Sequence, residues 1–380
     1  MNPVSVSCRH PDVRKFDGVR CCLACGLALF ESLPSDRHLD STEAAPTNAN
    51  QYSYKPLNYI LGQEIRLLSL DSGSLADAVT CHIIHVNLLD KPAFEALSYT
   101  WATQSGDASL SQIIYCDQRP IMITRNCEAA LRRLRKRAGR RLLWVDAICI
   151  NQNNEEEKNH QVGLMDVIYS SASQVLIYLG ICSPSIDRVF DYDKVFDYLS
   201  GATVTVPYDH DMRELLRRRW FERVWVLQEM SLARLAMMIF GTKIIRWDAQ
   251  SIEKTRQFCV RLGHNLPAVL NWQPGSRPDG DLFSHLQKSR NSSSTDPRDK
   301  VFALLSLAGP ESRKWILPDY SQTVGEVFTQ VATQIVLHHK TLDILLHTTP
   351  DAQRTDVCTV SSWAPRWEPH ISIHPSVPQF

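Results

Sequence analysis

The first 25 residues of the chain hold a cluster of residue types that bind transition metals. Cys8 and His10 form one close pair, and Cys22 and Cys25 form a second. Tetrahedral Zn²⁺ favours three thiolates and one imidazole brought together from two such pairs. A segment this short buries too little apolar surface to fold alone, and a bound metal explains how it folds. We therefore predict a structural zinc site, with Cys21 as a spare ligand or an alternative to Cys22; the competing interpretation is free thiols in an unfolded tail.

A second group of polar and aromatic side chains stands where two predicted strands end. One short strand runs into Ser98, Tyr99 and Trp101, and Asp146 lies in an almost continuously apolar stretch, residues 142–150. Such a stretch indicates a strand covered on both faces. Ligands of open parallel sheets bind beyond the carboxyl ends of the strands, and these side-chain types suit a nucleotide. The candidate nucleotide-binding residues are Ser98, Tyr99, Trp101, Asp146, Asn151, Gln152 and Arg223.

Two carboxylates in these segments have competing interpretations. Asp146 in a buried strand must be either paired or functional, because an isolated buried charge is very costly. Glu229 follows Trp225 by four residues, which places both side chains on one face of a helix. Glu229 either acts on a ligand or pairs with a nearby arginine, Arg223 or Arg219.

Two further features have simpler explanations. Cys149 is a potential nucleophile, but no histidine stands at a telling position, and we expect a structural thiol. Residues 132–141 include seven basic side chains that could bind phosphate groups. Their place on an amphipathic helix, with three glutamates at 155–157 to neutralise them, predicts a solvated helix face instead.

Composition limits the classes of protein. Among 380 residues, 44% are hydrophobic, and 41 basic side chains balance 41 acidic ones, so no net field attracts nucleic acid or an anionic membrane. The polar N-terminus is unlike a signal peptide, and no apolar run approaches the roughly 18 residues that cross a bilayer. Most of the 11 cysteines stand singly in apolar contexts, as reduced thiols do. We expect a protein of the cytosol, with the nucleus as an alternative.

Strands and helices alternate along the middle of the chain, which predicts an α/β fold with a mostly parallel, open sheet. The helical pattern dominates later, apart from a hairpin near residues 236–247. The expected organisation is a small N-terminal zinc-ribbon-like module, a linker, an α/β core and a mainly helical extension; the ranges are 1–31, 32–53, 54–240 and 241–380.

Four sequence blocks occur in an order that resembles the fungal heterokaryon-incompatibility (HET) domain family. They are EALSYTW (95–101), LLWVDAICINQ (142–152), VLIYLG (175–180) and RRWFERVWVLQEMSLA (218–233). RPIMITRNCEAALRRLR (119–135) between the first two also resembles the family. Later segments resemble those that commonly follow the HET core, namely DPRDKVFALLSLAG (296–309), LPDYS (317–321) and SSWAPRW (361–367). The family usually has glycine after SYTW, where this chain has Ala102-Thr103-Gln104, so the backbone of this loop is in question.

The resemblance implies an intracellular signalling domain of fungal non-self recognition whose activation leads to programmed cell death, a form of innate immunity. It also implies protein partners or self-association through the HET domain; we expect neither membrane nor nucleic acid as a partner. HET domains are in turn similar to TIR domains, some of which cleave NAD with a glutamate after a conserved tryptophan. By this analogy Glu229 is the catalytic residue and NAD the substrate. The alternative is a non-enzymatic, zinc-containing interaction or transcription-associated protein.

Overall fold

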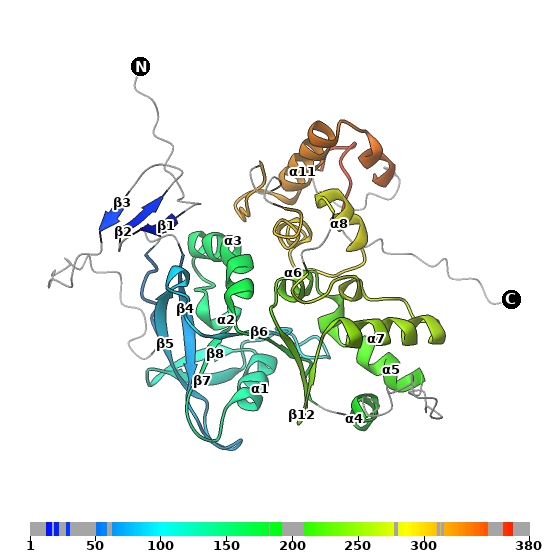
Figure 1. Ribbon diagram of the computed structural model, residues 1–380. Coiled ribbons are helices and arrows are strands. Elements are labelled where there is room, and N and C mark those ends of the chain that lie inside the picture. Colours follow the sequence, from blue (N-terminus) through cyan, green and yellow to red (C-terminus); the bar gives the residue numbers. More distant parts are fainter. Residues whose placement is uncertain are drawn as a thin grey trace. The chain divides into compact units, whose positions relative to one another are not determined.

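The structure is a computed structural model, and it divides the chain into two compact units, Met1–Gly180 and Ile181–Phe380 (Figure 1). The residues that it describes are 13–16, 19–22, 28–30, 51–58, 63–181, 183–191, 209–276, 280–309, 312, 315–348 and 360–367. Among these residues, no helix combines the length and the apolar composition that crossing a membrane requires.

The first unit is built on a mixed sheet with the strand order β10-β6-β9-β4-β5-β7-β8. The strands are β4 (Glu64–Leu70), β5 (Thr80–Asn87), β6 (Glu95–Ser98), β7 (Gln112–Cys116), β8 (Arg119–Ile123), β9 (Arg141–Trp144) and β10 (Val175–Tyr178). The pairs β10–β6, β6–β9 and β5–β7 are parallel, whereas β4–β5, β4–β9 and β7–β8 are antiparallel. The expected α/β class is confirmed, but the prediction of a mostly parallel sheet was wrong.

Hairpins explain two of the three antiparallel pairs, β4–β5 and β7–β8. A short connection returns the chain beside the strand that it leaves, so the two strands must be antiparallel. The sequence IIYCDQRPIMIT (113–124) predicts a hairpin that turns at Asp117 and Gln118. The β7–β8 hairpin turns there, and the two residues have positive φ angles of 49° and 65°. Two positive φ angles define the type I′ turn, whose twist matches that of a two-residue hairpin.

The apolar stretch at 142–150 is not one strand. Strand β9 ends at Trp144, and α2 (Asp146–Cys149) begins two residues later. Both elements are buried, so the stretch is apolar throughout and its pattern does not separate strand from helix. An acidic residue in the first helical turn complements the helix dipole, and Asp146 occupies that position.

The parallel strands β10, β6 and β9 position the segments that follow β6 and β9, which contain the candidate nucleotide-binding residues. Strand β6 lies between β9 and β10, although both follow it in the chain. The direction of strand addition therefore reverses at β6, and crevices form at the carboxyl ends beside such a reversal. Helix α1 (Arg125–Leu134) precedes β9, and α3 (Glu155–Ser171) connects β9 to β10. In Figure 1, α3 is drawn above β6 and α1 below it.

The N-terminal part of the first unit forms a small antiparallel sheet of β1 (Val13–Phe16), β2 (Val19–Cys22) and β3 (Ala28–Phe30). Arg20 of β2 donates to both carboxylate oxygens of Asp90, at 3.0 and 2.8 Å. Cys8, His10 and Cys25 lie outside the described residues, and Cys22 is described only through its backbone. The zinc site and the zinc-ribbon-like character of this module stay predictions.

The second unit is mainly helical and contains the expected hairpin. Strands β11 (Ala236–Phe240) and β12 (Lys243–Arg246) pair antiparallel. The longer helices are α4 (Pro184–Asp191), α5 (Asp209–Leu216), α7 (Ala249–Leu262) and α11 (Val324–His339). The shorter ones are η5 (Arg219–Glu222), α6 (Trp225–Ser231), η6 (Ala268–Asn271), α8 (Leu282–Lys288), α9 (Asp299–Phe302) and η7 (Asp343–His347).

Candidate functional site

Trp101 and Asp146 meet at the carboxyl ends of β6 and β9. The indole Nε1 of Trp101 donates to Asp146 Oδ2 at 2.9 Å, while Asp146 Oδ1 accepts the Ala147 N–H at 2.7 Å. Both side chains are half-buried. The two loops are therefore joined through side chains, as their place at one sheet edge predicted. Asp146 was expected to be either paired or functional, and a hydrogen-bonded partner is observed. Because that partner is the Trp101 indole, an aromatic ring and a carboxylate lie side by side.

Ser98 and Tyr99 lie beneath this edge. Their exposed fractions are 1% and 2%, and Ser98 is opposite Ile177 in the β6–β10 ladder. Burial raises the pKa of the Cys127 thiol to about 12, and the neighbouring Tyr99 side chain acts against this rise. The side chains of this pair pack in the core of the first unit and form the floor of the edge, whereas Trp101 reaches its surface.

Asn126 of α1 also holds the loop after β6, through Thr100. Its amide Nδ2 donates to the carbonyl oxygen of Thr100 at 2.6 Å and to the Thr100 hydroxyl at 3.0 Å. The Thr100 hydroxyl donates in turn to the carbonyl of Ala102 at 2.8 Å. The sequence reasoning did not single out Asn126, although it stands within the family-like block at 119–135, in the first turn of α1.

The loop does not need the glycine that the family usually has after SYTW. In the described residues, Gly106 has a positive φ of 97°, and no residue from Ala102 to Gln104 has one. The loop closes through hydrogen bonds from Thr103 N to Asp107 O at 2.8 Å and from Gly106 N to Thr103 O at 3.0 Å. The substitution of alanine at position 102 therefore leaves the backbone unstrained.

Gln152 and Asn151 take different roles near Asp146. The amide Nε2 of the exposed Gln152 donates to the Asp146 carbonyl at 2.9 Å, which places Gln152 beside the Trp101–Asp146 pair. The Asn151 side chain instead accepts the Asn153 N–H at 3.2 Å and stabilises its own turn. The structure thus brings Trp101, Asp146 and Gln152 together.

A buried ion pair that sequence reasoning missed supports this turn. Arg66 of β4 and Glu157 of α3 are 0% and 2% exposed, and Arg66 Nη2 donates to Glu157 Oε2 at 3.0 Å. Arg66 also donates to the carbonyls of Cys149, at 3.2 Å, and Lys55, at 2.6 Å. The two partners are 91 residues apart in sequence, and no local pattern connects them.

Asn154 with Glu157 three residues later predicts a capping box at the start of α3, and half of that box forms. Asn154 Oδ1 accepts the Glu157 N–H at 3.0 Å, so the N-cap is confirmed. The Glu157 carboxylate pairs with Arg66 and accepts the Asn151 N–H at 2.6 Å. The Asn154 N–H, which the other half of the box would use, donates instead to the Asn151 carbonyl at 3.1 Å. The Glu157 carboxylate is left to accept the stronger, charge-assisted bonds of the guanidinium.

Cys149 has the surroundings of a structural thiol. Its side chain is fully buried, and its sulfur accepts the Val145 N–H at 3.3 Å. Burial raises the pKa of the Cys149 thiol to about 12. A thiol that stays protonated near neutral pH is a poor nucleophile, in line with the expected structural role.

The basic run at 132–141 is only partly the solvated face that its pattern predicted: Lys136, Arg137 and Arg140 are exposed, whereas the other four basic side chains are half-buried or buried. Arg135 is 9% exposed, and its Nη1 donates to the Ala78 carbonyl at 2.7 Å. Arg132 Nη1 donates to the Asp77 carbonyl at 2.7 Å, and Arg141 makes a bidentate ion pair with the Glu95 carboxylate. Arg132 and Arg135 thereby fasten the β4–β5 turn to the end of α1, and Arg141 at the start of β9 joins β9 to β6, because each guanidinium supplies several donors in one plane.

Arg223 and Glu229 belong to the second unit, in and just before α6. Glu229 is 3% exposed, and its Oε1 lies 3.9 Å from Arg223 Nη1. This separation is longer than the 2.7–2.9 Å typical of a hydrogen-bonded ion pair. Of the two interpretations of Glu229, the pairing with Arg223 is the one that the geometry shows directly.

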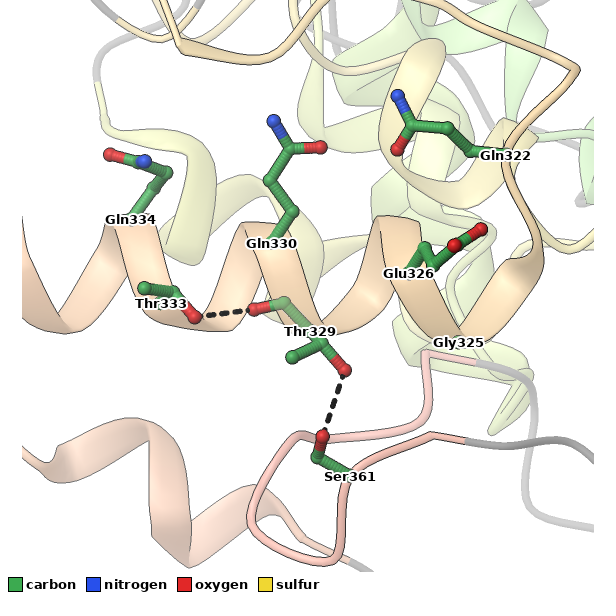
Figure 2. A pocket seen from close by; sticks show the side chains of 8 residues that line it. All are labelled: Gln322, Gly325, Glu326, Thr329, Gln330, Thr333, Gln334 and Ser361. Atoms are coloured by element: carbon green, nitrogen blue, oxygen red, sulfur yellow. Dashed lines mark hydrogen bonds between the residues drawn. The ribbon is translucent and has the colours of Figure 1, made fainter.

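A polar groove runs along α11 in the second unit (Figure 2). It is lined by Gln322, Gly325, Glu326, Thr329, Gln330, Thr333, Gln334 and Ser361. Glu326 caps its own helix, since its Oε2 accepts the Thr323 N–H at 2.7 Å and the Thr323 hydroxyl at 2.8 Å. The remaining lining side chains are amides and hydroxyls, which bind by hydrogen bonding but do not supply a nucleophile with its base.

Comparison with known proteins follows the same segments. Residues 94–229 match the family described as Heterokaryon incompatibility protein (HET). The chain is 27% identical over 396 aligned positions to "Heterokaryon incompatibility protein 6, OR allele" of Neurospora crassa. That alignment covers 81% of this chain and 58% of the relative, so the chain spans less than two thirds of the relative's length. No solved structure matches the chain.

Proposed function

Because residues 94–229 match the heterokaryon incompatibility (HET) family and most of the chain aligns with a protein of that name, we propose that it is a member of the family and an effector of fungal non-self recognition whose activation leads to cell death. The family match carries this proposal. Its activation involves protein partners or self-association through the HET domain. Expression in a fungal cell, scored for death with and without residues 94–229, tests it: survival of cells that express the full chain, brought to self-association, would reject the effector role.

The carboxyl ends of β6 and β9 are the proposed nucleotide site. The observation that supports it is the 2.9 Å hydrogen bond between Trp101 and Asp146, because it holds an aromatic face and a carboxylate together at the strand reversal. The indole face stacks on a base or a nicotinamide ring, and the Asp146 carboxylate accepts a ribose hydroxyl. The side-chain amide of Gln152 lies next to this pair and would hydrogen-bond to the edge of the bound ring, which gives selectivity for one ring over another.

The proposed reaction is NAD hydrolysis. The bond between the ribose anomeric carbon and the nicotinamide nitrogen breaks, water supplies the hydroxyl of ADP-ribose, and a proton is released. Glu229 stabilises the positive charge that develops on the ribose, an effect that is strong in a site shielded from water.

The N-terminal module carries a separate proposal, a structural zinc held by Cys8, His10, Cys22 and Cys25. Cys22 ends β2 in an antiparallel sheet, where it pairs with Val13. Metal analysis of the full chain is expected to give one zinc, lost on Cys25→Ser. Comparison of Cys21→Ser with Cys22→Ser decides which neighbour is the ligand. A full chain free of zinc would overturn the site and leave the HET proposal untouched.

A further inference from the structure

The start of α6 is held by a loop that lies outside the family match. The Val224 N–H donates to the Ser293 carbonyl at 2.9 Å, and the Ser293 N–H donates to the Glu222 carbonyl. Arg223 and Ser293 thereby form a parallel β-bridge. Val224 is the N-cap of α6 and provides no side-chain cap, and the helix has seven residues. A helix so short is marginal by itself, so this bridge fixes where it begins.

Lys300 holds the loop that carries Ser293. Its side chain is buried, with 2% exposed, and its Nζ donates to the Arg290 carbonyl at 2.8 Å and to the Ser292 carbonyl. A buried ammonium is costly unless its donors are satisfied, so these carbonyls and the ammonium constrain each other. The two carbonyls flank the exposed Asn291, and Ser293 follows directly.

The three family-like segments beyond the match contact either this loop or the residue next to Lys300. Lys300 belongs to DPRDK, and the neighbouring Asp299 accepts the hydroxyl of Tyr320, from LPDYS, at 2.5 Å. Trp367, the last residue of SSWAPRW, lies under the Arg290 guanidinium, 5.9 Å from its ring centre. Arg290 Nη2 also donates to the Arg366 carbonyl at 3.3 Å. DPRDK and SSWAPRW thus contact the loop at 290–293 directly, and LPDYS contacts the neighbour of Lys300.

We propose that Lys300 is a positioning residue for the Arg223–Glu229 pair, acting through the Ser293 bridge, and that residues 290–300 are part of the functional site. The expected effect of Lys300 on activity rests on the proposed NAD hydrolysis. The expected effect of Lys300 on the start of α6 rests on the Arg223–Ser293 bridge alone. Loss of the Lys300 ammonium releases the loop, the bridge opens, and α6 starts at a different residue, which moves Glu229.

The test compares Lys300→Met, which keeps the side-chain stem, with Lys288→Met at an exposed lysine of α8 as the matched control. Hydrogen exchange of the full chain should show the Val224 and Ser293 amides exchanging at least about tenfold faster in Lys300→Met, with β11–β12 unchanged. Nicotinamide release should lose kcat about tenfold or more while KM stays within about twofold, since only the transition state depends on the glutamate's position. Lys300→Arg, which retains charge and donors, should fall between wild type and Lys300→Met.

Each contrary result has a distinct meaning. Unchanged exchange at Val224 and Ser293 in Lys300→Met would overturn the positioning role. Loss of protection throughout the second unit, in β11–β12 as well, would also overturn it and make Lys300 a general stabiliser. If the wild type releases no nicotinamide, the proposed reaction fails, while the exchange of these two amides still decides whether Lys300 sets the start of α6.

Discussion

The two units contain the two parts of the HET match, and each part is fixed by a buried cation that lies outside residues 94–229. In the first unit Arg66 joins three segments, through Glu157 and the carbonyls of Cys149 and Lys55. In the second unit Lys300 donates to two carbonyls of a single turn, those of Arg290 and Ser292. A planar guanidinium binds in several directions at once, whereas an ammonium acts as a compact point charge.

This difference separates global from local support. Removing Arg66 leaves a buried carboxylate between β4 and α3, in the centre of the first unit, so the whole unit should lose stability. Removing Lys300 releases one loop and the helix start that it holds. The comparison also implies that a fragment limited to residues 94–229 lacks both Arg66 and Lys300, the supports of its two parts.

The largest expected effect is that of Arg66→Leu. Removing one partner of a buried ion pair costs about 3–5 kcal/mol, because the other charge stays buried without compensation. Denaturant unfolding of the full chain measures this loss of unfolding free energy. Arg137→Leu, at an exposed arginine, is the control and should change little. The double variant Arg66→Leu with Glu157→Leu should recover most of the loss; a double variant as unstable as the single one would contradict the charge argument.

In the second unit the largest effect should be on activity. Glu229→Gln keeps the side-chain volume and removes the charge, so nicotinamide release should fall at least about a hundredfold while the unfolding midpoint stays near that of the wild type. Glu222→Gln, at an exposed glutamate close by, is the control. Equal release from wild type and Glu229→Gln, measured on protein concentrated enough to self-associate, would reject the assignment of Glu229.

The two units also show which features could be predicted from the sequence and which could not. Local patterns predicted the Asn154 cap, the Asp117–Gln118 turn and the meeting of Trp101 with Asp146, because each depends on neighbours in sequence or on strand ends. The Arg66–Glu157 pair spans 91 residues, and nothing in either segment specifies its partner. The switch from β9 to α2 was missed because burial makes both elements apolar. Lys300 was passed over within a block that was otherwise recognised.

A smaller effect is expected from Trp101→Phe, which keeps a ring for stacking and loses the N–H that binds Asp146. A hydrogen bond to a charged group contributes about 1.5–3 kcal/mol, so NAD should bind about tenfold or more weakly as Asp146 loses its fixed orientation. Calorimetric titration measures this affinity. Trp363→Phe, at a tryptophan with 39% exposed, controls for loss of an indole elsewhere. Unchanged affinity in Trp101→Phe would remove the nucleotide from this edge.

The smallest effect should come from Ala102→Gly, which restores the residue usual in the family. Asn126 and Asp146 already hold this loop through Thr100 and Trp101, and position 102 has no positive φ that glycine would relieve. Glycine adds freedom to the unfolded chain, so the unfolding free energy should fall by about 0.4–1 kcal/mol, with NAD affinity unchanged. Gly106→Ala is the opposite test, because a side chain at φ 97° is strained and should cost about 1–2 kcal/mol. A gain in stability or affinity from Ala102→Gly would mean that the loop works in a conformation that alanine resists, and that its side-chain tethers release during function.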